Sequence, residues 1–140
     1  MSDTRPEPGE VWRYPFLWHR ERARGEAAGR KGRPCAVPVV VRQEAGGDVV
    51  YFLPITSQPP LPGREALTVP ETEARRAGLD TDRPLWVMLD EYNSDRVGAS
   101  FHIEPGARIG RLGEPFLREI RARFASLVAR RLARVVSRRG

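Results

Sequence analysis

The sequence has few of the residues that build metal sites and disulfide frameworks. Its 140 residues include one cysteine, Cys35, and two histidines, His19 and His102. A single cysteine cannot form an intramolecular disulfide, and the two histidines are too far apart in the chain to give metal-ligand spacing. We therefore expect neither a structural metal nor a disulfide framework.

Long apolar runs are also missing. The first ten residues, MSDTRPEPGE, carry charges with no hydrophobic run after them. Nowhere do about 18 apolar residues follow one another, so the sequence predicts neither a signal peptide nor a membrane span. We expect a cytoplasmic protein with a flexible N-terminal tail at residues 1–8 and one domain at residues 9–137, because a chain of this length can bury a single core.

Lysine is almost absent, whereas arginine is abundant. Lys31 is the one lysine among 24 basic residues, and the formal net charge is +6 with a pI near 10.6. A basic surface favours anionic partners such as nucleic acid or acidic protein segments. Heavy use of arginine also arises from a GC-rich genome, so charge alone leaves both explanations open.

The apolar pattern is typical of short strands with one long helix at the end. Trp12, Tyr14 and Phe16 alternate on one face of a first strand, and a Gly-Gly pair between two β-rich runs indicates a hairpin. A polar connection at residues 17–32 is long for a small domain, which is typical of a functional lid or of disorder. The expected strands cover residues 9–16, 35–43, 49–55, 64–70, 84–93 and 97–104, the last pairing back onto the one before it.

Two helices are expected, a short one at residues 71–79 and a closing one at residues 114–137. In the closing helix, apolar residues recur at i, i+3 and i+4, and arginines occupy much of the remainder. It would pack on the sheet with a basic face in water, although such a helix can also lie on a membrane surface. The fold class is then mainly β with a C-terminal α-helix (α+β), its sheet curled into a small barrel. The apolar positions are Leu117, Ile120, Phe124, Leu127, Val128, Leu132 and Val135.

The hairpin brings two polar segments near each other. If its turn is centred on the glycine pair, opposite residues have numbers that sum to about 93, so Thr56 and Ser57 return beside Val37 and Ala36. Arg33 then lies about 10 Å further along the same strand end. A guanidinium beside hydroxyl groups suits a phosphodiester, because arginine gives bidentate charge-assisted contacts to phosphate. The ordinary alternative is a solvated turn arginine and a strand end capped by hydroxyls.

Five segments in the same order resemble the PemK/MazF toxins. They are GEVWRYPF, GRKGRPCAVPVVV, YFLPITSQ, LWVMLDEYN and IGRLGEPFLREIRARF, and the resemblance extends over about Gly9 to Leu127. The resemblance implies an SH3-like small barrel of the CcdB/PemK/MazF type, commonly a homodimer. It also implies a metal-independent endoribonuclease that needs no cofactor, cleaves single-stranded RNA, often mRNA, and is restrained by a cognate antitoxin.

The resemblance places Arg33 on the catalytic arginine of the family and Thr56 on its catalytic hydroxyl residue. The RNA 2′-hydroxyl would attack its own phosphate, Arg33 would stabilise the phosphorane charge, and Thr56 would position or exchange a proton. His19, in the long connection, is a third catalytic candidate, or simply an exposed loop histidine. Ser57 and Gln58 continue the Thr56 segment, Arg30 and Lys31 would steer phosphate, and Trp18 or Tyr92 would stack a base or belong to the core or rim.

Three segments depart from the family pattern. They are the connection LWHRERARGEAAGRKG, the segment DEYNSDR and the arginine-rich tail beyond Leu127. These departures leave open a second hypothesis, a catalytically silent nucleic-acid- or protein-binding module on the same barrel, including gyrase binding of the CcdB type. The ending ARVVSRRG lacks the terminal Trp-Gly-Ile segment of that type, which makes gyrase binding less favoured, while a simple RNA- or DNA-binding module stays open.

Overall fold

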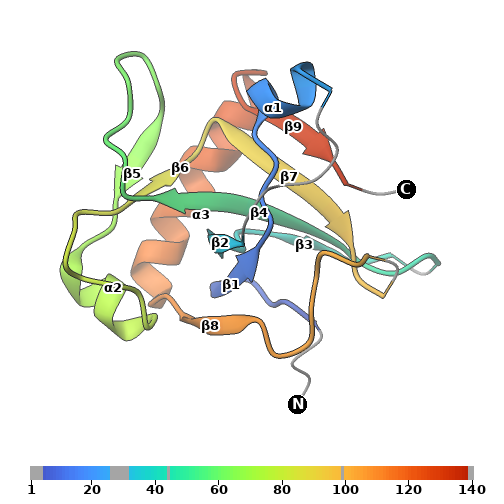
Figure 1. Ribbon diagram of the computed structural model, residues 1–140, viewed down its shortest axis with the longest axis horizontal. Coiled ribbons are helices and arrows are strands. Elements are labelled where there is room, and N and C mark those ends of the chain that lie inside the picture. Colours follow the sequence, from blue (N-terminus) through green and yellow to red (C-terminus); the bar gives the residue numbers. More distant parts are fainter. Residues whose placement is uncertain (1–4, 26–31, 44, 99, 139–140) are drawn as a thin grey trace.

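The computed structural model describes residues 5–25, 32–43, 45–98 and 100–138, which form a curled sheet with a long helix against one side (Figure 1). Arg30 and Lys31 lie outside the described residues. No helix in these ranges has the length and apolarity needed to cross a bilayer. The elements in chain order are β1 (Glu10–Tyr14), α1 (His19–Ala23), β2 (Arg33–Ala36), β3 (Val40–Val41), β4 (Val49–Thr56), β5 (Ala66–Thr68), α2 (Glu71–Arg76), β6 (Trp86–Met88), β7 (Glu91–Arg96), β8 (Arg108–Arg111), α3 (Glu114–Ala129) and β9 (Arg134–Ser137).

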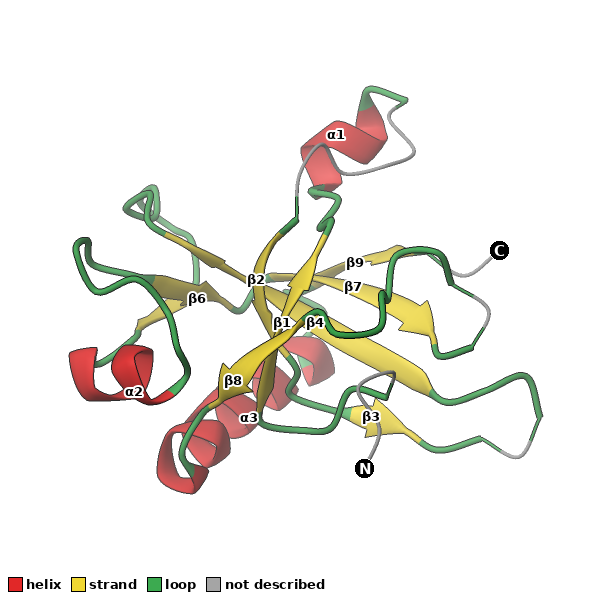
Figure 2. Cartoon of the chain, turned by 60° about the horizontal axis from the view of Figure 1, so that its bottom comes forward, coloured by secondary structure: helices red, strands yellow, loops and turns green. Residues whose placement is uncertain are grey.

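Strand β4 is the centre of the sheet. Its first half pairs antiparallel with β3 and β7, and its second half pairs antiparallel with β2 and β6. Strand β1 connects β2 to β8, β5 lies beside β6, and β9 runs parallel to β7 (Figure 2). The fold is thus mainly antiparallel β with a C-terminal helix, and the predicted α+β class is confirmed.

The sheet is open, whereas a closed barrel was expected. Among the described strands, β5 and β8 lie at the two ends of the strand order and do not pair with each other. Gly110 in β8 lies so close to the backbone of Ala77 that a Cβ atom would collide with the Ala77 carbonyl oxygen. The chain that leaves α2 therefore packs directly on the backbone of β8.

The first strand has the predicted alternation. Trp12, Tyr14 and Phe16 belong to one buried cluster. Within it, the Tyr14 ring stacks on the Phe52 ring, with 3.9 Å between the ring centroids. Val11 points the other way, into the cluster that α3 covers. Both faces of the curled sheet are therefore buried at β1, because successive side chains of a strand point to opposite faces and apolar ones occur on each.

The closing helix is shorter than predicted, because it ends at Ala129 and not at residue 137. Arg131 adopts a positive φ of 59°, and the amide of Leu132 donates to the Leu127 carbonyl, which turns the chain back. The following β-branched pair, Val135 and Val136, then joins β7 as strand β9. Pairing with a distant strand edge overrides the helical period in this segment.

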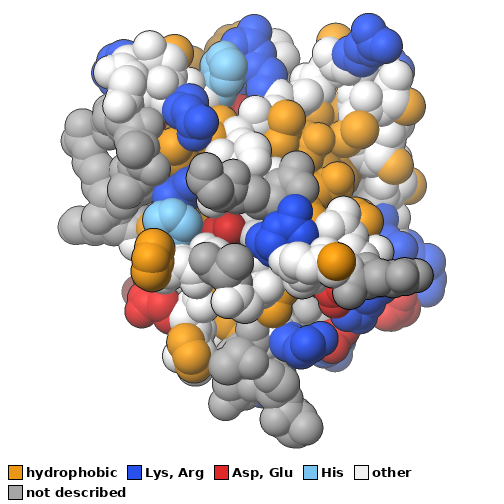
Figure 3. All heavy atoms as spheres, turned by 90° about the vertical axis from the view of Figure 1, so that its right-hand side faces the viewer, with side chains coloured by type: hydrophobic (Ala, Val, Ile, Leu, Met, Phe, Trp, Pro, Cys, Tyr) orange, Lys and Arg blue, Asp and Glu red, His pale blue; other side chains and the backbone are white. Residues whose placement is uncertain are grey.

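This ending changes which apolar residues are buried. Leu117, Ile120, Phe124 and Leu127 pack into the core, as predicted. Val128, Leu132 and Val135 were expected on the same face but are 39%, 51% and 49% exposed. Figure 3 views the side of the molecule where β9 and β7 end, and it shows apolar side chains interspersed with basic ones.

The predicted strand at residues 84–93 is two strands with a bend at Asp90. The Asp90 carboxylate accepts two hydrogen bonds from Arg64, each 2.8 Å long, and one from the amide of Glu65. The expected strand at residues 97–104 is wrong, since the described part of this segment is not extended into a ladder. β7 pairs with β4 and β9, and β8 takes the place beside β1.

The hairpin register also differs from the prediction. Val40 lies opposite Val50 and Cys35 opposite Pro54, so paired residue numbers sum to 90 and then 89, not to about 93. Asp48 closes the loop by accepting hydrogen bonds from Arg42 and from the backbone amide of Gln43. These contacts centre the loop just before the two glycines. Between β3 and β2 the strand is interrupted, and the sum of paired residue numbers falls by one more.

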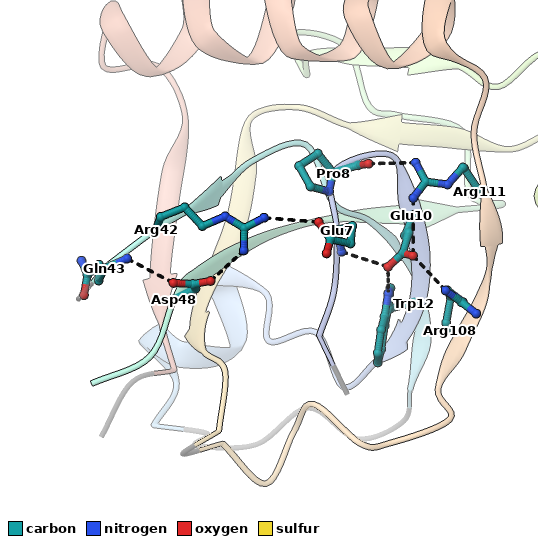
Figure 4. Close-up of polar contacts among 9 residues, drawn as sticks. All are labelled: Glu7, Pro8, Glu10, Trp12, Arg42, Gln43, Asp48, Arg108 and Arg111. Carbon is teal, nitrogen blue, oxygen red and sulfur yellow. Dashed lines mark hydrogen bonds and ion pairs between the residues drawn. The ribbon is translucent and has the colours of Figure 1, made fainter. Parts of the chain in front are cut away.

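The N-terminal segment is held by a buried carboxylate (Figure 4). Glu10 is 3% exposed and accepts hydrogen bonds from the indole nitrogen of Trp12 and the amide of Glu7, both at 2.9 Å. Arg108 of β8 adds a third contact at 3.1 Å. Pro6, within the expected tail, is buried, so residues that directly precede β1 contribute to the packing.

Replacing Glu10 by alanine should lower the free energy of unfolding by about 2 kcal/mol, because the buried indole donor of Trp12 loses its acceptor. Urea denaturation followed by tryptophan fluorescence measures this loss. Glu7→Ala is the matched control, since that side chain is exposed and its ion pair with Arg42, at 3.3 Å, lies at the surface. If both variants lose the same free energy of unfolding, the buried Glu10 carboxylate stabilises the fold no more than the exposed Glu7 carboxylate does.

Candidate functional site

An open cleft of about 470 Å³ lies where β2 begins, β4 ends and the turn before β6 passes. It joins the two segments that the sequence singled out, although they are far apart in the chain. Its lining residues are Arg33, Pro34, Ile55, Thr56, Ser57, Gln58, Asp80, Arg83 and Leu85.

The observed register explains why these residues meet. Cys35 pairs with Pro54, so continuing the ladder toward the start of β2 brings Arg33 level with Thr56. The sequence-based register had left Arg33 about 10 Å beyond the hydroxyl residues. The corrected register therefore brings Arg33 and Thr56 closer together than predicted.

Thr56 presents its hydroxyl at the edge of the cleft. The residue is 8% exposed, and its Oγ1 accepts a hydrogen bond of 3.0 Å from the backbone amide of Gln58. Because the oxygen is already an acceptor for the amide, its own proton remains available for donation to a ligand. Ser57 and Gln58 follow along the same wall.

The Arg33 guanidinium rests against an aromatic ring. Its Cζ lies 5.2 Å from the centroid of the Trp18 ring, and the Cζ of Arg20 lies 5.1 Å from the same centroid. Such cation–π contacts contribute about 0.5–1 kcal/mol each at exposed sites. The backbone amide of Trp18 donates to the Glu21 carboxylate at 3.0 Å, which caps the start of α1.

Trp18 therefore positions Arg33. It is only 8% exposed, and two guanidinium groups lie over its ring, which agrees with the core or rim alternative. Base stacking by Trp18 stays a prediction. The sequence did not reveal this contact, because the intervening chain between Trp18 and Arg33 gives no periodic signal.

The cleft has a basic balance and no activated thiol. Two guanidinium groups, Arg33 and Arg83, line it together with one carboxylate, Asp80, whose Oδ1 accepts the amide of Asp82 at 2.8 Å. Burial raises the pKa of the Cys35 thiol well above its usual range, although the charge of Arg33 opposes the shift. The thiol is thus protonated at neutral pH and is not a nucleophile.

Two other predicted site residues lie elsewhere. His19 begins α1, where its backbone amide donates to Glu91 at 2.8 Å, and it is not among the residues that line the cleft. Tyr92 is packed against Tyr51 and Phe124 in the core beneath α3, and burial raises the pKa of its hydroxyl. This placement agrees with the core alternative for Tyr92, and its contact with a base stays a prediction. Within the described ranges, no three His, Cys, Asp or Glu side chains gather as a metal site.

The turn after α2 supplies the cleft residues that the sequence did not predict. Asp80, Arg83 and Leu85 belong to a stretch that reads as an ordinary polar connection. One signal was present: both cleft arginines directly precede a proline, Pro34 or Pro84. A residue before proline is disfavoured in the helical backbone conformation and is usually extended.

A second polar cluster lies at the C-terminal end of β9. Arg138 donates to the Pro15 carbonyl at 2.7 Å and to the Asn93 side chain at 3.2 Å, and its Nη2 lies 3.1 Å from Nε2 of His102. Burial lowers the pKa of His102, and the positive charge of Arg138 lowers it further, while Asp95 acts in the opposite direction. The arrangement thus favours neutral His102.

Stability should therefore fall as the pH drops below 6.5, the ordinary histidine pKa. In that range the unfolded chain binds a proton at His102 that the folded protein resists, so protonation favours unfolding. Urea denaturation above and below this pH gives the slope, and His102→Gln should flatten it. A slope unchanged by His102→Gln would assign the effect to other groups.

Comparison with known proteins gives no relative, since no family model, no curated protein and no solved structure matches this chain.

Proposed function

We propose that this protein is a PemK/MazF-like endoribonuclease that cleaves single-stranded RNA. One observation carries the proposal: Arg33 and the Thr56–Gln58 segment, remote in sequence, line one cleft together with a second arginine, Arg83. An open basic cleft with hydroxyl donors suits a phosphodiester, because guanidinium groups bind phosphate oxygens through charge-assisted hydrogen bonds. The order of the five sequence segments supports the same assignment.

The proposed reaction is an internal transesterification. The RNA 2′-oxygen bonds to the adjacent phosphorus as the bond to the 5′-oxygen breaks, which leaves a 2′,3′-cyclic phosphate and a 5′-hydroxyl. One proton leaves the 2′-hydroxyl and one reaches the departing 5′-oxygen, so water is not consumed. Arg33 stabilises the negative charge on the phosphorane oxygens, and Thr56 donates a hydrogen bond to one of them.

The proposed reaction needs a group that accepts the proton of the RNA 2′-hydroxyl. Arginine stays protonated at neutral pH and cannot act as a base, and the buried thiol of Cys35 is protonated as well. Asp80 is the one carboxylate among the lining residues. His19 remains a candidate only if α1 approaches the bound RNA, because it does not line the cleft.

The resemblance adds partners to this proposal. A homodimer and an acidic antitoxin are properties of the PemK/MazF toxins, and both are part of this proposal. The net charge of +6 favours both RNA and an acidic inhibitor.

Incubation of the purified protein with single-stranded RNA in EDTA tests the proposal. We expect shorter RNAs that carry a 2′,3′-cyclic phosphate on one new end and a 5′-hydroxyl on the other, as read by end-group analysis. RNA binding without any new ends would contradict the ribonuclease and support the catalytically silent binding module.

A further inference from the structure

A second cleft of about 290 Å³ lies beside the candidate site. Arg83 and Leu85 line both clefts, so the turn before β6 forms the wall between them. The far side of the second cleft is built by the end of β5 and the first turn of α2. Its lining residues are Thr68, Val69, Glu71, Ala74, Thr81, Asp82, Arg83, Pro84 and Leu85.

We propose that this second cleft binds the base of a nucleotide next to the scissile phosphate and thereby selects the cleavage sequence. The inference rests on the proposed ribonuclease function. Arg33 and Thr56 hold the reacting phosphate in the first cleft, and the shared wall places the second cleft within reach of the same RNA strand. Arg83, on that wall, is suited to the phosphate that joins the two nucleotides.

The walls of the second cleft suit a flat heteroaromatic ring. Val69, Ala74, Pro84 and Leu85 provide an apolar surface, and polar groups lie around it. This combination of an apolar body with a few polar groups is typical of small-ligand sites. Bases of single-stranded RNA are free to turn into such a cleft, since they are neither paired nor stacked in a duplex.

The polar groups predict which bases are preferred. Glu71 is bound to Arg75 at 2.7 Å, whereas no hydrogen bond or ion pair of the Asp82 carboxylate occurs in the described part of the chain. A free carboxylate accepts hydrogen bonds from an exocyclic amino group, as on cytosine, adenine or guanine. Uracil has carbonyl oxygens in place of that group, so the second cleft should disfavour uracil.

The test is cleavage of a randomised single-stranded RNA pool in EDTA, with sequencing of the new ends. The wild-type protein should show, at one position next to the cut, a bias against uracil. Asp82→Asn should reduce that bias by about tenfold, because an amide can donate to uracil oxygens as well as accept. Thr68→Trp fills the cleft from an exposed strand position and should erase the bias, while Glu104→Gln, an exposed acid-to-amide control, should preserve it.

The outcomes separate this inference from the proposed function. If all of the variants cleave the pool with the wild-type base distribution, the second cleft is not a base subsite, although the ribonuclease assignment stands. If the wild-type protein produces no ends that depend on Arg33, the ribonuclease assignment itself fails, and the subsite fails with it. Urea denaturation of each variant verifies that the fold is retained.

Discussion

Arg33→Ala should reduce RNA cleavage by about a thousandfold or more, the loss expected when a transition-state arginine is removed. Arg33 is half-buried at the first residue of β2, with its guanidinium at the cleft and against the Trp18 ring. The stabilised charge develops mainly in the transition state, so the rate should fall far more than RNA affinity. Single-turnover cleavage of a labelled RNA, together with binding by fluorescence anisotropy, measures the two effects.

Two further variants make this expectation specific. Arg33→Lys keeps the charge but loses the planar fork, so it should recover only part of the rate. Arg13→Ala removes an exposed arginine of β1 that donates to the Gly32 carbonyl at 3.2 Å and does not line the cleft. It should cleave within a few-fold of the wild-type rate. Comparable activity in Arg33→Ala and Arg13→Ala would overturn the assignment of Arg33.

Local patterns predicted several of the strands, but they missed β8 and β9 and did not predict how the strands pair. The alternation of Trp12, Tyr14 and Phe16 gave the correct faces of β1, because that signal depends only on neighbouring residues. The hairpin register depended on Asp48, whose contacts to Arg42 and Gln43 close the loop away from its glycines. Glycines permit a turn, but side-chain contacts across the loop decide where its centre falls.

The end of the last helix shows the limit of helical periodicity. The apolar spacing continues through Leu132 and Val135, yet the helix stops at Ala129 and the chain becomes a strand. The edge of β7 offers unpaired backbone groups, and β9 satisfies them through a parallel ladder. A partner that lies about forty residues away in sequence leaves no mark on the local pattern.

Only part of the cleft could be predicted from the sequence. Arg33 and Thr56 belong to segments whose residue types suggest phosphate chemistry, and the hairpin brings those segments together. Asp80 and Arg83 enter the cleft only because β4 pairs with β6, which places the preceding turn beside Thr56. That pairing is a tertiary contact with no short-range sequence signal.

The largest loss of stability should follow Asp95→Ala. Asp95 is 1% exposed and accepts hydrogen bonds from the hydroxyls of Tyr14 at 2.6 Å and Ser100 at 2.7 Å, and from the amide of Arg96. The variant strands the Tyr14 hydroxyl, itself in a 1% exposed residue, without this acceptor. The expected cost is about 3 kcal/mol or more, a large share of the roughly 5–15 kcal/mol that stabilises a typical domain.

A double-mutant cycle isolates the Tyr14–Asp95 contact from the rest of the network. Tyr14→Phe keeps the ring stacked on Phe52 but removes the hydroxyl, so Asp95→Ala should cost less in that background than in the wild-type protein. Asp82→Ala, at an exposed position, serves as the matched aspartate control and should change the urea midpoint little. If Asp95→Ala costs the same with and without the tyrosine hydroxyl, the 2.6 Å contact does not couple the two residues, and stability in this region comes from ring packing.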